Sequence, residues 1–247
     1  PEKLRVIQPL FCYHFSMLTE EKLDPVTEKR LHDAIALQQA DQANQAIIQY
    51  QLILNAYPEH ALVHHLLGIT LAQCGTLDRA QKSLQTAVSL QPQNPHYLSS
   101  LANLLRRQGD IDQATSYFEN ALKLNPQLVS AHNNLALIFF SNNVQRAELH
   151  LRKALTIMPD HVDANYNLGL LLHDRNRHQA KLHFERAAHS DNQFIPARYQ
   201  LAQIYQAEKA HRKAIMWYQS ILQIMPTHAE SLYKIGLTYL ELDDTTQ

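Results

Sequence analysis

The sequence contains 15 histidines among 247 residues, so a metal site is the first chemistry to consider. A zinc site needs His or Cys ligands on one face, commonly two His four residues apart on a helix plus a third ligand. His64 and His65 are adjacent and would face different directions on a helix. His173, His178 and His183 are five residues apart and do not share a face either. The sequence therefore predicts no metal, and we expect the histidines to lie on the surface.

Motifs of other catalytic sites are also missing. The sequence has no glycine-rich phosphate loop and no Gly-x-Ser-x-Gly turn. Its two cysteines, Cys12 and Cys74, have no metal-ligand spacing and no plausible His partner for nucleophilic catalysis. We therefore expect a chain that is not an enzyme and has no cofactor. Two isolated cysteines also favour reduced thiols and a cytoplasmic location.

Charge and hydropathy exclude two further classes of partner. The net charge is −1, whereas nucleic-acid binding usually leaves a strongly basic footprint. The longest apolar run, residues 9–18, is shorter than the ~20 residues that span a bilayer. We expect no nucleic-acid partner and no membrane insertion. Because the first residue is Pro and not Met, we expect the true N-terminus to lie upstream, and a removed targeting segment stays an open alternative.

Proline returns at nearly constant intervals along the chain, which indicates an internal repeat. Successive intervals are 34, 34, 33 and 67 residues, and the last corresponds to two repeats with Asn192 in the place of the missing proline. The prolines are Pro58, Pro92, Pro126, Pro159 and Pro226. An alanine precedes the end of every unit by the same distance, and these alanines are Ala46, Ala80, Ala114, Ala147, Ala180 and Ala214.

The first half of each unit has its own signature of an aliphatic residue, then Gly or Ala, then an aliphatic residue or Tyr. It reads LLGITL, SLANLL, NLALIF, NLGLLL, QLAQIY and KIGLTY, beginning at residues 66, 100, 134, 167, 200 and 234. Together with the recurring Ala, the apolar residue after it and the Pro, this pattern resembles the tetratricopeptide repeat (TPR) over residues 27–247. The tryptophan sometimes seen near the start of that repeat is absent.

The resemblance implies an all-α fold, a right-handed α-α superhelical solenoid of about six and a half TPR helix hairpins. The expected hairpins span residues 27–60, 61–94, 95–128, 129–161, 162–194 and 195–228, and a half repeat follows at 229–247, with a single helix over 229–241. Residues 1–26 form an N-terminal segment in which 14–25 weakly echo the end of a repeat, as a capping helix would. An unpaired last helix would leave apolar residues uncovered. We therefore expect a fragment of a longer polypeptide.

Small residues have two predicted roles. Gly68, Gly169 and Gly236, like the alanines at the equivalent positions, are expected where two helices approach closely. Gly75 and Gly109 are expected in the left-handed conformation at the turn within a hairpin. Asn143 and Asn176 are expected to take that conformation in the two units that are one residue shorter.

The resemblance also implies that first helices line a concave groove, which suits a peptide or a partner segment. Helical geometry places amides and phenols on that side in the middle and later units. Our candidate partner-binding residues are Asn103, Arg106, Asn133, Asn134, Tyr166, Asn167, Tyr199, Gln200 and Tyr233. An amide both donates and accepts, so amides one repeat apart can pair with an extended peptide backbone.

This arrangement is similar to the asparagine ladder in the repeats of O-GlcNAc transferases, although only Asn134 and Asn167 match strictly. The simpler alternative is that these residues are solvated polar side chains. The clamp that holds the C-terminal carboxylate of chaperones is disfavoured, because Ser99 and Asp163 occupy positions that need basic residues.

Three functional hypotheses follow. The first is a protein-protein interaction scaffold, an adaptor that binds a partner segment in its groove. The second is the N-terminal substrate-recruitment region of a larger glycosyltransferase or methyltransferase whose catalytic domain lies beyond residue 247. The third is assembly of a homodimer through the exposed terminal helices.

Overall fold

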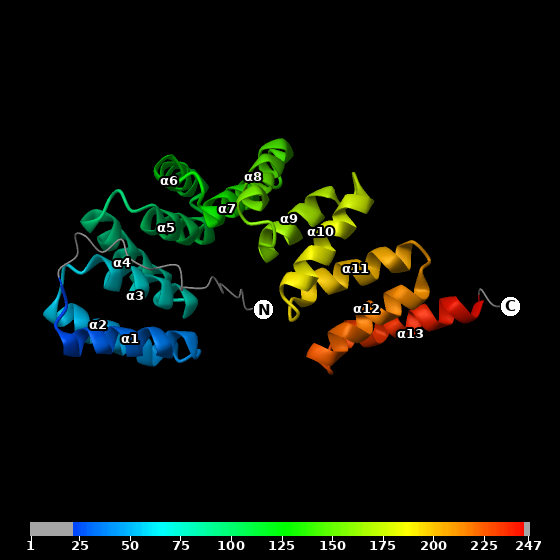
Figure 1. The fold of residues 1–247 in the computed structure, drawn as a ribbon, viewed down its shortest axis with the longest axis horizontal. Helices are drawn as coiled ribbons and strands as arrows, with labels where there is room; N and C mark the ends of the chain where they lie inside the picture. The colour runs from blue at the N-terminus through cyan, green and yellow to red at the C-terminus, as the bar shows by residue number, and fades with distance from the viewer. Residues whose placement is uncertain (1–21, 245–247) are drawn as a thin grey trace. The chain divides into compact units, whose positions relative to one another are not determined.

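The computed structural model describes residues 22–244, and it contains α-helices and no strand within that range (Figure 1). The helices are α1 (Pro25–Gln39), α2 (Ala43–Ala56), α3 (Ala61–Gln73), α4 (Leu77–Leu90), α5 (Pro95–Gln108), α6 (Ile111–Leu124), α7 (Val129–Phe139), α8 (Val144–Ile157), α9 (Val162–Leu172), α10 (Arg177–Ser190), α11 (Ile195–Ala207), α12 (His211–Ile224) and α13 (Ala229–Asp244). The chain divides into two compact units, with α1–α4 in the first, up to Pro92, and α5–α13 in the second, from Gln93.

Within each unit, every helix packs most closely against its neighbours along the chain. In the first unit, α1 pairs with α2 and α3 with α4. The second unit holds the hairpins α5/α6, α7/α8, α9/α10 and α11/α12, followed by α13, which packs on α12. The predicted all-α architecture of stacked helix hairpins is confirmed.

Small residues lie at the helix crossings, as expected, but the expectation is wrong for Gly236, where an added methyl group would meet no described atom within 4 Å. The six recurring alanines are completely buried. A methyl group added at Gly68 would lie 2.6 Å from Cγ of Leu84, and one added at Gly169 would lie 2.6 Å from Cε1 of Phe184. Since real side-chain contacts are almost never that short, the absence of a side chain at these two positions permits the close packing of each first helix on its second helix.

The turns within the hairpins confirm one prediction and correct another. Gly75 and Gly109 have φ of 80° and 89°, which is the left-handed region. Asn143 and Asn176 do not, because their φ angles are −152° and −151°. Each instead caps the following helix, and its side chain accepts a hydrogen bond from the backbone N–H three residues later.

The physical reason for this correction is the missing residue. Units of 33 residues have shorter first helices, α7 and α9, and three turn residues, 140–142 and 173–175, separate the end of each from the next N-cap. None of these turn residues has a positive φ, so the two shorter units make the turn without a left-handed residue. In the hairpins α1/α2 and α11/α12, the left-handed conformation is instead taken by Asp41, at φ 60°, and Lys209, at φ 56°.

The ends of the described range bear on two expectations. Helix α1 begins at Pro25, and Asp24 caps it by accepting from the N–H groups of Val26 and Thr27. The capping helix expected over residues 14–25 lies almost entirely outside the described residues. At the other end, α13 begins at Ala229 as expected and extends to Asp244. No described helix is long and apolar enough to cross a membrane.

Candidate partner-binding surface

The predicted binding residues all lie on first helices of the second unit. Asn103 and Arg106 belong to α5, Asn133 and Asn134 to α7, Tyr166 and Asn167 to α9, Tyr199 and Gln200 to α11, and Tyr233 to α13. Helix α7 contacts both α5 and α9 directly, in addition to its neighbours along the chain. Residues from three successive repeats are therefore brought onto adjoining helices.

Two of the asparagines form a hydrogen-bonded pair between repeats. Nδ2 of Asn167 donates to Oδ1 of Asn133 over 3.0 Å, and the residues are 8% and 7% exposed. The pair joins α7 to α9. It leaves the Nδ2 donors of Asn133 and the Oδ1 acceptor of Asn167 without a partner among the described residues. The sequence placed both side chains on the same side of the solenoid but did not predict that they bond to each other.

The neighbouring polar residues are also held in place. Nδ2 of Asn134 donates to the backbone oxygen of Ser130 over 2.9 Å, one turn earlier in α7. On α5, a guanidinium N–H of Arg106 donates to Oδ1 of Asn103 over 3.1 Å. Burial lowers the pKa of Arg106, and the charge of Arg107 adds to this effect. Nε of Arg106 is buried and finds no acceptor in the described part of the chain.

Two of the predicted tyrosines pack into the layer between repeats. The ring of Tyr166 meets Phe194 edge-on at 5.3 Å and lies 5.8 Å from Phe184. Tyr199 packs against Tyr218, and its hydroxyl donates to Glu230 on α13. Burial and this carboxylate raise the pKa of Tyr199.

The last two predicted residues are more accessible. Gln200 on α11 is half-buried, and Tyr233 on α13 is 65% exposed. Near them, an open depression of about 570 Å³ is lined by the amides Gln203 and Gln206 and by the charged residues Lys234 and Glu241. These four belong to the same side of the first helices as the predicted residues, so the polar surface continues to the end of the second unit.

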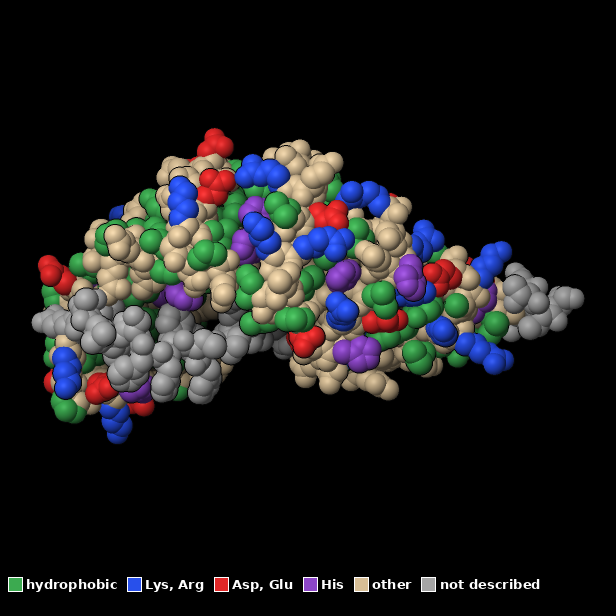
Figure 2. Space-filling model, turned by 45° about the horizontal axis from the view of Figure 1, so that its top comes forward, with side chains coloured by type: hydrophobic (Ala, Val, Ile, Leu, Met, Phe, Trp, Pro, Cys, Tyr) green, Lys and Arg blue, Asp and Glu red, His purple; other side chains and the backbone are tan. Residues whose placement is uncertain are grey.

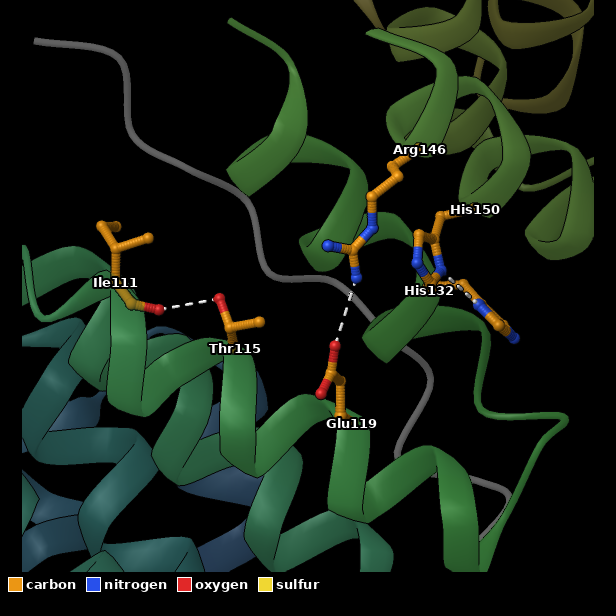
Figure 3. A network of polar contacts seen from close by, with 6 residues as sticks. All are labelled: Ile111, Thr115, Glu119, His132, Arg146 and His150. Carbon is orange, nitrogen blue, oxygen red and sulfur yellow. Dashed lines mark hydrogen bonds and ion pairs between the residues drawn. The ribbon is translucent and has the colours of Figure 1, made fainter. Parts of the chain in front are cut away.

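A polar junction that the sequence did not reveal links α7 to α8. Nδ1 of His132 lies 3.0 Å from Nδ1 of His150 (Figure 3). Nε2 of His132 lies 3.0 Å from the backbone oxygen of Pro126. The guanidinium of Arg146 lies 3.9 Å from the ring centroid of Phe139 and pairs with Glu119 on α6 at 3.2 Å. His132 is buried, so the expectation of surface histidines is wrong here, as it is for His60, His65 and His211.

The same junction recurs with different side chains. At one position of the first helix, a side chain bonds to the backbone oxygen six residues earlier, in the loop from the preceding repeat. The pairs are His64 with Pro58, His132 with Pro126, Asn165 with Pro159, and Arg198 with Asn192, at 2.8 to 3.0 Å. Asn165 also faces His183 on α10 at 2.9 Å, as His132 faces His150. A polar residue six positions after the repeat proline is the signal that could have predicted this contact.

Two features of the described part of the chain bear on its binding chemistry: possible metal ligands and the charges on one face. No group of three His, Cys, Asp or Glu side chains that could hold a metal ion occurs among residues 22–244. On the face drawn in Figure 2, basic and acidic side chains lie interspersed. The binding chemistry of the candidate surface is therefore that of amides, phenols and single charges.

Models of the repeat match three stretches of the chain. A TPR repeat model matches residues 102–143, and a tetratricopeptide repeat model matches residues 61–94 and 195–228. The probable biofilm formation methyltransferase WspC of Pseudomonas putida is 34% identical over 87 residues, which are 35% of this chain and 20% of that protein. The chain thus matches only a fifth of the length of this curated relative.

Solved structures resemble the chain over most of its length. A Pseudomonas aeruginosa pilF structure aligns with a TM-score of 0.69 and 16% identity, covering 89% of this chain and 97% of that one. The structure of PilW, a widely conserved type IV pilus biogenesis factor, aligns with a TM-score of 0.71 and 18% identity, covering 86% of this chain and 99% of that one. At these identities, the likeness concerns the fold.

Proposed function

Because this chain belongs to the tetratricopeptide repeat family, we propose that it is a non-catalytic scaffold that holds an extended segment of a partner protein along the first helices of its second unit. The interaction surface comprises Asn103 and Arg106 on α5, the Asn133–Asn167 pair with Asn134, and the amides near the end of α11. We expect the scaffold to act in the cytoplasm, which cell fractionation tests.

The observation that carries this proposal is the incomplete hydrogen bonding of the Asn133–Asn167 pair. Asn133 keeps its Nδ2 donors, and Asn167 keeps its Oδ1 acceptor. A peptide group offers the matching pair, one acceptor and one donor. A backbone segment lying across α7 and α9 would complete both amides. Because these contacts involve only the peptide group, they suit many side-chain sequences.

Arg106 supplies the charged element of the surface. Its Nε–H lacks an acceptor among residues 22–244, and a buried guanidinium donor without a partner is costly. A carboxylate of the partner would accept from it in charge-assisted geometry. We therefore expect partner segments in which an acidic residue lies next to a stretch whose backbone binds the Asn133–Asn167 pair.

A peptide display library provides the test and requires no identified partner. Random twelve-residue peptides are selected on the chain, and the selected peptides are measured against the double substitution Asn134→Ala with Asn167→Ala and against Arg106→Ala. We expect each variant to weaken binding at least tenfold, or about 1.4 kcal/mol. Met216→Ala, at an exposed position on α12, is the matched control and should bind normally.

Folding must be monitored because Asn167→Ala leaves Oδ1 of Asn133 without its donor. Circular dichroism melts of each variant separate lost binding from lost structure. Peptides that bind the folded variants as tightly as the parent chain would exclude this surface as the binding site.

The relative from Pseudomonas putida favours a second candidate function. That protein is named as a probable methyltransferase, and the match to this chain covers a fifth of it. In this alternative, the repeats recruit the substrate of a catalytic domain located beyond residue 247. The size of the endogenous protein tests it, since an immunoblot band no larger than a chain of 247 residues would exclude a fused enzyme.

A further inference from the structure

Helix α3 carries an apolar row on the side that corresponds to the predicted groove. This α3 row consists of Leu62, Leu66 and Ile69. In α5 the same three positions hold polar side chains, which are His96, Ser100 and Asn103. Leu66 is 1% exposed, and the other two members of the row are half-buried. An apolar row that is kept from water needs other apolar side chains packed on it.

The α3 row is not the surface through which α3 packs on its second helix. Helix α4 approaches α3 at Gly68, where Leu84 fills the space beside the missing side chain. At 100° per residue, Gly68 lies roughly 100–160° around the helix axis from the three residues of the row. The row therefore faces away from the closest contact between α3 and α4.

The chain enters α1 beside the start of α3. The hydroxyl of Tyr57 accepts from the backbone N–H of Asp24 over 3.3 Å and donates to Oδ2 of Asp24 over 3.0 Å. Tyr57 is the C-cap of α2, and His60, three residues later, is the N-cap of α3. These two bonds hold the entry to α1 at the loop between α2 and α3, next to the N-terminal end of the α3 row.

The residues before this anchor include the longest apolar run of the sequence, PLFCYHFSML, residues 9–18. Phe11, Phe15 and Leu18 are spaced four and then three residues apart, which is also the spacing within the α3 row. Side chains at this spacing share one face of a helix. The chain from Leu18 to Asp24 reaches at most about 20 Å, and the row is about 10 Å long, so the run can reach all of it.

We propose that residues 9–18 dock on the α3 row and run antiparallel to α3. The direction follows from the anchor, because Leu18 is closest in sequence to Asp24 and so lies at the N-terminal end of the row. Phe11 then lies towards the C-terminal end. The run contains no Asp, Glu, Lys or Arg, so docking buries no formal charge of these residue types. This contact belongs to the first unit and is independent of peptide binding by the second.

The covalent connection favours this occupant over a partner in solution. A segment on a short flexible tether has an effective concentration in the millimolar range. A partner present at about 1 μM would need roughly a thousandfold higher affinity for the α3 row to displace it. We therefore expect residues 9–18 to occupy the row in the isolated chain.

The two natural cysteines test the docking and its direction. The proposed arrangement places Cys12, next to Phe11, near the C-terminal end of α3, where Cys74 is the C-cap residue and its thiol is exposed. With a short dimaleimide reagent, we expect a cross-link within one chain at a rate that does not depend on protein concentration. The matched control carries Cys74→Ser and Gln85→Cys, which moves the thiol to an exposed position on α4, and should cross-link at least tenfold more slowly. Equal rates would overturn the proposal.

A further pair of variants separates docking from the chance encounters of a tethered segment. Phe11→Asp with Phe15→Asp introduces two carboxylates that an apolar row excludes, so we expect the rate of this cross-linking to fall at least tenfold. Gln8→Asp with Thr19→Asp adds the same charge at polar positions outside the run and should leave the rate unchanged. Circular dichroism verifies that the helix content is retained. A rate that the phenylalanine substitutions do not lower would contradict docking.

A mixture of isotope-labelled and unlabelled chains identifies the chain that supplies the segment. Mass spectrometry of the cross-linked peptides should find both cysteines in the same chain. Cross-links that join labelled to unlabelled peptides would show that a second copy supplies the segment, and they would overturn docking within one chain.

Discussion

Nδ1 of His132 on α7 lies 3.0 Å from Nδ1 of His150 on α8, so a hydrogen bond between them requires one ring to donate and the other to accept. Nε2 of His132 faces the backbone oxygen of Pro126, which only accepts, so this nitrogen carries the hydrogen. Nδ1 of neutral His132 is then the acceptor, and Nδ1–H of His150 is the donor. Protonation of His132 would place two N–H groups face to face and break the pair.

Acid should therefore destabilise the second unit. Burial, together with the charge of His132, lowers the pKa of His150 to about 4, and burial lowers the pKa of His132. Below the ordinary histidine pKa of about 6.5, the unfolded chain binds protons that the folded chain does not, so stability is complete above that pH and falls towards pH 4. The loss is at most about 1.4 kcal/mol per pH unit for each histidine, and less where a ring is partly exposed. Urea unfolding at a series of pH values measures it.

The next repeat provides the control for this pH dependence. There, Asn165 takes the place of His132 and accepts from His183. His132→Asn should preserve the contact with the Pro126 oxygen while removing one titrating ring. We expect a nearly unchanged free energy of unfolding at pH 7.5 and a smaller loss at pH 5. An identical pH profile in this variant would show that the histidine pair does not govern acid stability.

Alanine at two glycines should have opposite effects on stability. Gly236→Ala meets no atom and should raise the free energy of unfolding by about 0.5–1 kcal/mol, because alanine loses less conformational freedom in a helix. Gly169→Ala places a methyl group 2.6 Å from the buried ring of Phe184 and should lower it by about 1–3 kcal/mol. Chemical denaturation of both variants measures the difference, and stabilisation by both would contradict the close packing at Gly169.

The role of Asn143 as a helix cap can be distinguished from that of a left-handed turn residue. As a cap, Asn143→Ala should cost about 1 kcal/mol of stability and Asn143→Gly only a few tenths. Gly109→Ala, at φ 89°, should cost roughly 1–2 kcal/mol because a side chain is strained in that conformation. If Asn143→Gly instead stabilised the protein, the left-handed assignment would be favoured after all.

Ala114 tests the packing at a hairpin crossing. It is completely buried on α6, so Ala114→Leu should lower the free energy of unfolding by about 1–3 kcal/mol through overpacking. Ser116→Leu lies two residues away on the exposed side of the same helix and should change it by less than about 0.5 kcal/mol. Thermal unfolding followed by circular dichroism compares them, and equal melting temperatures for the two variants would argue against a crossing at Ala114.

The repeat period predicted the helix hairpins because packing depends on residue size at fixed positions, as Gly68 and Ala114 illustrate. Side-chain hydrogen bonds were not predictable in the same way. Asn133 and Asn167 were placed on the same side of the solenoid, but their mutual bond depends on the spacing between repeats. His132 looked like a surface residue because its polar partners, Pro126 and His150, lie in other segments. The turn at Asn143 was misassigned because the 33-residue spacing shows that the unit is one residue short but not that its first helix ends earlier.

The bond between a first helix and the preceding loop has a consequence for engineering this protein. His132 belongs to one repeat and the Pro126 oxygen to the loop before it, and elsewhere the donor is Asn165 or Arg198. A chimera joined between residues 126 and 132 would recombine donors and loops that did not evolve together. A chimera joined at the turn within a hairpin, near Asn143, would keep each first helix together with the loop that it bonds to. The segment that can be exchanged between repeat proteins therefore begins in the middle of one repeat and ends in the middle of the next.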